Sequence, residues 1–257
     1  MDEGHEVIRS RANPSLKRVD RVARGKEPDA MLLEGERLVM DALGAGHLAE
    51  LLLVREDHVA LLERLEGPRT RAVAPSLFER LGTLSTPPGV LGIFPRPARR
   101  DEEALEAELD RHELVLGVAG VADPGNLGAL ARCAEAAGAT ALVLAPGGAR
   151  PFTPKALRGS MGSLLRLAVY EVADLGRAVG SLAAAGFGQR VAATRGGAPL
   201  DDAVFPRRVA VWMSGETGEA PPELSVCEPV TIPMGGEVES LNVTVAGALM
   251  LFAARRR

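Results

Sequence analysis

The sequence predicts an α/β protein whose larger, C-terminal part is built on a parallel sheet. Residues 114–121 form a continuous apolar run of the kind that is buried on both faces of such a sheet. Further apolar runs follow at 139–145, 168–172, 189–194, 209–213 and 230–233, with helical stretches between them. Strands that alternate with helices imply right-handed crossovers, and therefore a parallel sheet.

A smaller α/β unit is predicted before this sheet. Helical patterns at 38–45 and 59–65 flank a strand at 51–54. Pro95 and Pro97 cannot continue a helix, and the acidic stretch behind them shows no apolar face. A chain of 257 residues has room for two modest domains. We therefore expect a first domain over 1–97, a linker over 98–112 and a second domain over 113–257.

The composition indicates a globular protein without a membrane segment or metal site. The chain is 46% hydrophobic and 25% charged, which excludes disorder and fibrous repeats. The first ten residues are charged where a signal peptide would be apolar, and no stretch reaches the roughly 18 apolar residues of a membrane span. Cys133 and Cys227 are too few and too far apart for a disulfide scaffold or a metal cluster. We expect a cytoplasmic protein.

The charge pattern leaves an RNA-binding function open. The net charge is −4, and only 3% of residues are aromatic, which argues against recognition by stacked rings. One stretch nevertheless carries seven cations against the single acid Asp20: Arg9, Arg11, Lys17, Arg18, Arg21, Arg24 and Lys26. This basic stretch is either an electrostatic footprint for RNA or an ordinary solvated helix face.

Three clusters of candidate functional residues follow strand ends. Residues 123–132 combine a tight turn with a helix start, where Asn126 is a natural N-cap and Arg132 lies further along the helix. Residues 213–219 form a glycine-containing turn, and 232–244 place Ser240 and Asn242 at the start of a closing helix. Taken singly, the first and third clusters are explained by plain helix capping, and the second by a solvent-facing turn. No G-x-G-x-x-G fingerprint is present, so a dinucleotide site is not expected.

The closing helix has a regular apolar spacing. Leu241, Val245, Ala248 and Phe252 recur at i, i+4, i+7 and i+11, which predicts one apolar face.

Taken together, the clusters resemble the three motifs of the SpoU (TrmH-like) family of SPOUT RNA methyltransferases. The resemblance covers residues 114–257 and rests on Asn126, Gly128 and Arg132, then Gly215-Glu216, then Ile232-Pro233-Met234 with Ser240-Leu241-Asn242. Residues 155–163 resemble the stretch between the first two motifs. Residues 10–17 and 32–39 resemble the substrate-binding extension of the ribosomal-RNA members, a small α/β domain related to RNA-binding ribosomal proteins.

The resemblance implies a fold and a cofactor that the strand pattern does not. The pattern alone predicts a Rossmann-like domain, because knots are nearly absent from proteins. The family implies instead a SPOUT-type parallel sheet with a C-terminal trefoil knot, a homodimer that shares its active site, and S-adenosylmethionine (AdoMet) as cofactor. The implied cofactor-binding residues are Leu144, Ala145, Gly215, Glu216, Ile232, Met234 and Leu241.

The implied reaction is methylation of a ribose 2′-hydroxyl in structured RNA. The catalytic residues would be Arg132, Asn126, Glu216, Ser240 and Asn242, and the RNA-binding residues Arg9, Arg11, Asn13, Lys17, Arg18, Arg37 and Arg158. Arg132 keeps its proton at neutral pH, so we expect it to bind phosphate and stabilise the alkoxide rather than act as a base. The N-terminal extension favours large-subunit ribosomal RNA. A tRNA methyltransferase, a non-catalytic RNA-binding assembly factor and a small-molecule enzyme are the alternatives.

Overall fold

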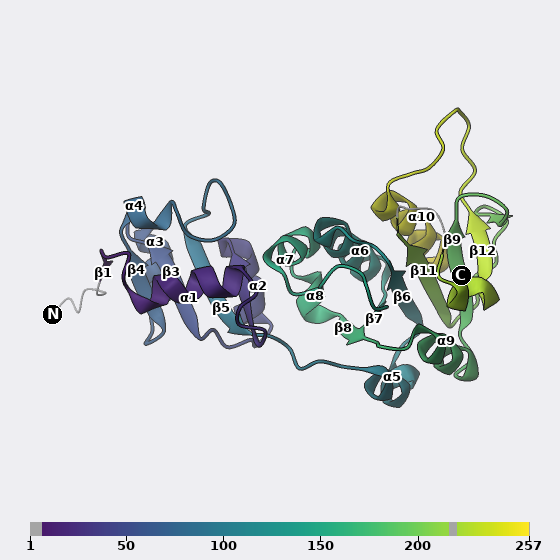
Figure 1. Ribbon diagram of the computed structural model, residues 1–257, viewed down its shortest axis with the longest axis horizontal. Helices are drawn as coiled ribbons and strands as arrows, with labels where there is room; N and C mark the ends of the chain where they lie inside the picture. The colour runs from purple at the N-terminus through teal and green to yellow at the C-terminus, as the bar shows by residue number, and fades with distance from the viewer. Residues whose placement is uncertain (1–6, 216–219, 257) are drawn as a thin grey trace. The chain divides into compact units, whose positions relative to one another are not determined.

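The computed structural model describes residues 7–215 and 220–256. The chain divides into two compact units, which Figure 1 shows as ribbons. The first unit holds residues 1–97 and 152–158, and the second holds residues 98–151 and 159–257. The short segment 152–158 therefore belongs to the first unit, although both of its flanks belong to the second.

The first unit is a five-stranded mixed sheet in the order β1-β4-β3-β5-β2. β4 pairs in parallel with β1 and β3, whereas β5 is antiparallel to β2 and β3. The strands are β1 (Val7–Ile8), β2 (Ala30–Glu34), β3 (Leu51–Arg55), β4 (Thr70–Val73) and β5 (Val90–Pro95). The helices are α1 (Pro14–Ala23), α2 (Glu36–Gly44), α3 (Val59–Arg64) and α4 (Pro75–Phe78). The predicted α/β alternation in this region is confirmed.

Helix α1 shows how the sequence fixes an element of this unit. Its first turn contains Pro14, and the Asn13 side chain accepts the backbone N–H of Ser15 at 2.9 Å. The side that carries Leu16, Val19 and Val22 is buried in the core of the unit. The basic residues of α1 consequently lie on its outer side.

The second unit is a seven-stranded sheet in the order β10-β12-β9-β11-β6-β7-β8, and every pair in it is parallel. The strands are β6 (Leu114–Ala119), β7 (Ala141–Leu144), β8 (Ala168–Glu171), β9 (Gly188–Ala193), β10 (Ala198–Pro199), β11 (Val209–Ser214) and β12 (Glu228–Thr231). The predicted parallel sheet is confirmed. The two-residue β10 is too short to give a sequence pattern.

The helices of the second unit are α5 (Glu102–Glu108), the 3-10 helix η1 (Leu109–Arg111), α6 (Pro124–Ala137), α8 (Ser163–Arg166), α9 (Leu175–Ala184), the 3-10 helix η2 (Pro222–Val226) and α10 (Val243–Arg255). Most of α7 (Pro154–Ser160) lies in the segment 152–158, which belongs to the first unit. α6 packs on α10, which also contacts β11. α5 packs on α9, and both contribute to a core around the buried Trp212 and Tyr170.

The acidic stretch expected to be a linker without a buried face is folded onto the second unit, so that expectation is wrong. Leu105 and Leu109 are buried against α9. The Glu102 carboxylate accepts the backbone N–H of Ala173, and that of Asp174 at 2.6 Å. Burial raises the pKa of Glu102, but these amides outweigh burial and hold the pKa below its usual value. Leu105 and Leu109 are one helical turn apart and are surrounded by acids in the sequence, so their buried side gives no clear apolar pattern.

The face predicted for the closing helix is also corrected. Leu241, Val245 and Phe252 are 37%, 48% and 40% exposed, and the buried side of α10 is formed by Val243, Gly247, Met250, Leu251 and Ala254. The helix is therefore apolar on both sides. Periodicity alone found an apolar face, but not the one that packs on the sheet.

Within residues 7–215 and 220–256, no helix is both long and apolar enough to cross a membrane. The same residues contain no group of three His, Cys, Asp or Glu side chains arranged to hold a metal ion. Cys133 and Cys227 are free thiols.

Candidate active site

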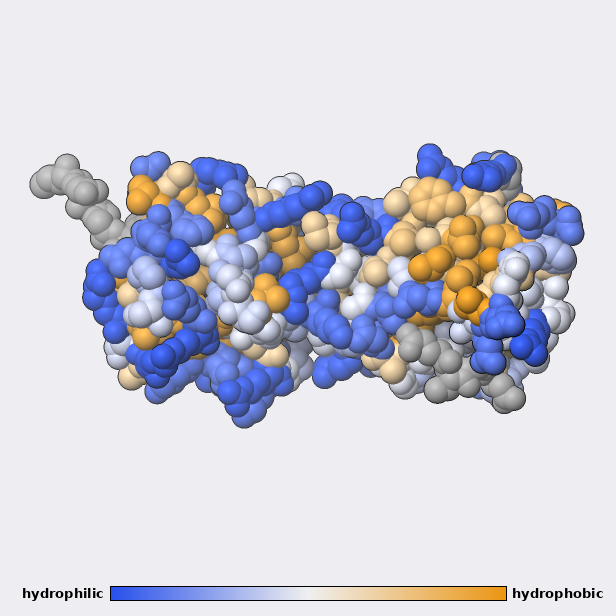
Figure 2. Space-filling view, turned by 90° about the horizontal axis from the view of Figure 1, so that it is seen from above, coloured by the Kyte–Doolittle hydropathy of each residue, from blue (hydrophilic) through white to orange (hydrophobic). Residues whose placement is uncertain are grey.

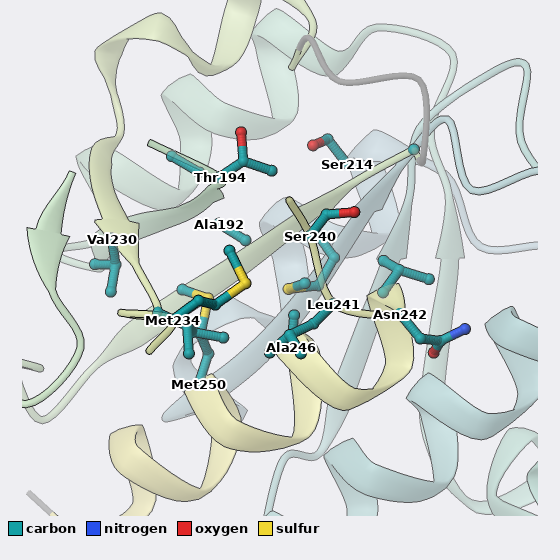
Figure 3. Close-up of a pocket in the computed structure, with 15 residues that line it drawn as sticks. Ala192, Thr194, Ser214, Val230, Met234, Ser240, Leu241, Asn242, Ala246 and Met250 are labelled. Carbon is teal, nitrogen blue, oxygen red and sulfur yellow. The ribbon is translucent and has the colours of Figure 1, made fainter. Parts of the chain in front are cut away.

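A cavity of about 360 Å³ lies at the carboxyl ends of β9, β11 and β12, beside the start of α10 (Figure 3). Such strand ends are where open α/β sheets bind ligands. The cavity is lined by Ala192, Ala193, Thr194, Met213, Ser214, Gly215, Val230, Ile232, Met234, Ser240, Leu241, Asn242, Val243, Ala246 and Met250. Its volume is within the range of roughly 300–1,000 Å³ that is usual for small-molecule sites.

The cavity has an apolar floor and a polar rim. Met213, Val230 and Met250 are almost fully buried, whereas Thr194, Ser240 and Asn242 are exposed. In Figure 3, Thr194, Ser214 and Ser240 lie on one side, away from Val230 and Met250. No lining residue that the structure describes carries a charged side chain. This arrangement suits a ligand with a flat apolar part and a polar end.

Two glycines fix the turn that forms one wall of the cavity. Gly215 directly follows β11 and lies against Gly120, which follows the adjacent β6 and has a φ of +78°. A Cβ on Gly215 would be 2.3 Å from the Gly120 carbonyl oxygen. The close approach of the two backbones therefore requires glycine at position 215.

The first and third motifs lie side by side through α6 and α10. Asn242 caps α10 by accepting the backbone N–H of Thr244 at 2.9 Å, and the Thr244 hydroxyl donates to the Asn126 side chain at 3.5 Å. Asn126 itself is not the N-cap of α6, as the sequence suggested. Asp123 takes that role and accepts the Asn126 N–H at 3.0 Å, because the helix begins one turn earlier at Pro124.

Arg132 lies on α6, outside the cavity. Its side chain is exposed and has no hydrogen bond or ion pair to any residue that the structure describes. Burial raises the pKa of the neighbouring Cys133 thiol, and the Arg132 charge partly opposes this. Within one chain, the structure thus brings together Asn126, Ser240 and Asn242, but leaves Arg132 apart from the cavity.

The expected cofactor-binding residues are divided between two places. Gly215, Ile232, Met234 and Leu241 line the cavity, as do Ser240 and Asn242. Glu216 lies outside the described residues.

Leu144 and Ala145 do not line the cavity, which corrects the expectation of one pocket. Leu144 ends β7 and Ala145 follows it, and the sheet order places β7 on the far side of β6 from β11, β9 and β12. Ala145 instead lines a separate cavity of about 400 Å³.

Sequence reasoning missed residues 192–194, which line the cavity. They end the strand predicted at 189–194, and Arg-Gly-Gly follows them. That polar, glycine-rich turn after an apolar strand was the available signal.

The stretch at 155–163 packs closely against the first motif. A Cβ on Gly159 would be 2.9 Å from the Gly125 carbonyl oxygen, in the first turn of α6. Met161 has a φ of +48°, and Gly162 a φ of +86°. A left-handed methionine is uncommon, and this one lies in the turn that joins α7 to α8 next to the motif.

Several of the expected RNA-binding residues are engaged by acids of the first unit. Arg9 pairs with Glu56 at 2.6 Å, and Arg18 with Glu27 at 3.0 Å and with Glu50. The Arg21 and Arg18 guanidiniums lower the pKa of Glu27. The basic stretch is consequently neutralised in part.

The remaining expected RNA-binding residues differ in their surroundings. Arg37 lies 4.0 Å from Asp41, Asn13 caps α1, and Arg158 bonds the Glu34 carboxylate and, at 2.7 Å, the Thr83 hydroxyl. Arg11 and Lys17 are exposed without a hydrogen bond or ion pair to any described residue.

The α/β fold and its parallel sheet match those of SPOUT methyltransferases of known structure. The chain belongs to the SpoU rRNA Methylase family, whose model matches residues 113–252.

The similarity to individual proteins extends beyond residues 113–252. The 23S rRNA (guanosine(2553)-2′-O)-methyltransferase RlmP of Bacillus subtilis is 29% identical over 229 residues, which cover 88% of this chain and 89% of the relative. An AdoMet-bound rRNA methyltransferase from Sinorhizobium meliloti superposes with a TM-score of 0.82 at 27% identity, over 98% of this chain and 97% of the other. AviRb of Streptomyces viridochromogenes, solved with AdoMet, gives 0.79 at 26% identity, over 95% and 97%.

Proposed function

We propose that this protein uses AdoMet to methylate a ribose 2′-hydroxyl in large-subunit ribosomal RNA. The observation that carries the proposal is the uncharged cavity at the carboxyl ends of β9, β11 and β12, formed by the second and third motifs of a SpoU family member. Two proteins similar over almost the whole chain support the substrate and the cofactor: one is named for 23S rRNA 2′-O-methylation, and the other was solved with AdoMet.

The residues of the cavity fit AdoMet. Met213, Val230 and Met250 offer an apolar floor to the adenine ring, and the backbone beside Gly215 offers polar groups to its edge. Among the described lining residues there is no positive charge to repel the sulfonium cation. The hydroxyls of Ser214 and Ser240 offer hydrogen bonds to the polar end of the ligand. Bound AdoMet supplies an electrophilic methyl group.

The protein's own residues would position the acceptor and stabilise its charge. The ribose 2′-oxygen forms a bond to the methyl carbon as the carbon–sulfur bond breaks, a neutral thioether leaves, and the hydroxyl proton passes to another group or to water. Arg132 binds the neighbouring phosphate and stabilises the developing alkoxide. Asn126, Ser240 and Asn242 orient RNA and cofactor, and we assign the same role to Glu216. Positioning of this kind removes much of the barrier.

We propose a homodimer, because one side of α10 carries exposed apolar residues. Val245, Leu249 and Phe252 on α10 are 40–48% exposed, and Figure 2 shows a hydrophobic area on the second unit. Such areas mark interfaces. A second copy would also supply Arg132, which lies outside the cavity of its own chain. Phe252→Glu should give monomers in sedimentation equilibrium, whereas Val226→Glu, at an exposed position on η2, should leave the dimer intact. Dimeric Phe252→Glu protein would contradict this interface.

We also propose two details of the fold that the resemblance to the family implies. The segment between β12 and α10 would thread a loop to make a trefoil knot, and the first unit would be an RNA-binding domain of ribosomal-protein type. The return of α10 onto α6 supports the first idea. Arg11 and Lys17, which are exposed and pair with no described residue, support the second. A ribosomal RNA substrate and two free thiols fit a reducing cytoplasm.

Methyl transfer in vitro tests the function. Purified protein, methyl-labelled AdoMet and an unmodified large-subunit ribosomal RNA transcript should give label in alkali-resistant dinucleotides, because a 2′-O-methyl group blocks hydrolysis of the adjacent phosphodiester. AdoMet should also stabilise the protein by about 2.7 kcal/mol at a hundredfold excess over Kd. NAD should give no thermal shift. Label on a base, or transfer only to tRNA, would contradict the proposal.

A further inference from the structure

A cation that pairs with none of the described residues follows the cavity wall in the sequence. Arg195 follows Thr194, which lines the cavity at the carboxyl end of β9. Its side chain is exposed and forms no hydrogen bond or ion pair with any described residue. Other arginines of the second unit are engaged, for example Arg177 with Glu106 at 2.9 Å and Arg207 with Glu113 at 2.8 Å. The free charge of Arg195 is thus available to a ligand.

The turn that carries Arg195 is held against the strand that leads into the cavity wall. Gly196 has a φ of +79°, and a Cβ on Gly197 would be 2.6 Å from the Pro229 carbonyl carbon. The backbone N–H of Gly197 donates to the Thr231 hydroxyl at 3.0 Å, and Ala198 pairs with Val230. Ile232, which follows β12, lines the cavity. The Arg195 backbone is therefore fixed relative to the site.

The position of this cation suits a ligand that arrives from solvent. The polar rim of the cavity includes the exposed Thr194 and Ser240 (Figure 3). In RNA, the 2′-oxygen and the 3′-phosphate are carried by neighbouring carbons of the same ribose. An acceptor whose 2′-oxygen reaches this rim therefore brings a phosphodiester with it. A guanidinium binds the two free oxygens of a phosphate with a planar pair of N–H groups.

We propose that Arg195 binds a backbone phosphate of the RNA beside the methylated nucleotide, and so positions the acceptor over the cofactor cavity. This inference rests on the proposed function and adds to it a residue of the RNA-binding surface in the methyltransferase unit. Arg195 holds the substrate and takes no part in the proton transfer.

The test compares Arg195→Gln with Arg207→Gln. Arg207 lies two residues before β11, so the control removes the same charge at the opposite, amino edge of the sheet. Binding of the unmodified large-subunit ribosomal RNA transcript is measured over a range of salt concentrations. The KM for RNA, kcat and the Kd for AdoMet are measured for each protein.

We expect Arg195→Gln to raise the Kd and KM for RNA by about five- to tenfold and to reduce the salt slope by about one. The Kd for AdoMet and kcat should stay within about twofold of the parent, and Arg195→Lys should recover the salt slope but only part of the affinity. Arg207→Gln should match the parent.

Unchanged RNA binding by Arg195→Gln overturns the inference while leaving the proposed function in place. Weaker AdoMet binding with unchanged RNA affinity overturns it too, and assigns Arg195 to the cofactor carboxylate. A parent protein that neither binds nor methylates the transcript overturns both proposals.

Discussion

Replacement of Gly215 by alanine tests the geometry of the cofactor cavity. The added Cβ would be 2.3 Å from the Gly120 carbonyl oxygen and 3.0 Å from its carbonyl carbon. Both obstacles are backbone atoms at the ends of two paired buried strands, so neither can rotate away as a side chain would. The turn that forms the cavity wall must move instead.

The size of the effect follows from that contact. The 2.3 Å approach must widen by roughly 0.7 Å to reach the 3.0 Å below which Cβ atoms are essentially never found. Overpacking of this kind costs about 1–3 kcal/mol. If this whole free-energy cost is taken from AdoMet binding, the Kd for AdoMet rises by about 5- to 150-fold, since 1.4 kcal/mol corresponds to a factor of ten.

Isothermal titration calorimetry with AdoMet measures this change, and thermal unfolding shows how much of the cost falls on the fold. Gly235→Ala is the matched control, because a Cβ there meets nothing within 4 Å and Gly235 lies in the loop that follows β12. Parent-like affinity and stability in Gly215→Ala would refute the reasoning. Equal losses in both variants would show that the Gly120 contact is not the cause.

Three further predictions concern catalysis, the domains and a thiol. Arg132→Ala should lower single-turnover methyl transfer by at least about a hundredfold at unchanged AdoMet affinity, and Arg132→Lys should rescue poorly; a change of a few-fold, or a loss confined to cofactor binding, would contradict this. Removal of residues 1–97 should leave a dimer that binds AdoMet but holds RNA weakly, with less salt dependence; unchanged RNA affinity would make the basic stretch a solvated face. Burial raises the pKa of Cys227 to about 11. In a Cys133→Ser background its thiol should therefore react slowly at pH 8 and about tenfold faster per pH unit up to that pKa; reaction at the rate of an exposed thiol would contradict this.

The sheet of the second unit could be predicted because its strands are buried on both faces. The run at 114–121 contains only apolar residues and glycine, which few other structures allow. The helix over 102–108 could not be found in the same way. Leu105 and the following Leu109 are buried, but the acids around them pair with Arg177 or lie in solvent. Glu102 is buried only because its carboxylate accepts hydrogen bonds from two backbone amides.

The candidate site was predicted in part, since motif residues specify local turns but not strand order. Gly215, Ile232 and Leu241 line one cavity because β11 and β12 lie on the same side of β6 as the start of α10. Leu144 ends an equally apolar strand, β7, yet the sheet order places that strand on the other side of β6. Thr194 lines the cavity for the same reason, because its strand β9 lies between β12 and β11 in the sheet. Pairing between distant strands decides these positions, and no local pattern encodes it.

The most direct test of the account is a map of 2′-O-methyl groups in total RNA from cells with and without this protein. The account predicts that one ribose of the large-subunit ribosomal RNA loses its methyl group in the cells that lack the protein, and regains it with the parent gene but not with Arg132→Ala. An unchanged map, or a loss confined to transfer RNA, would contradict it.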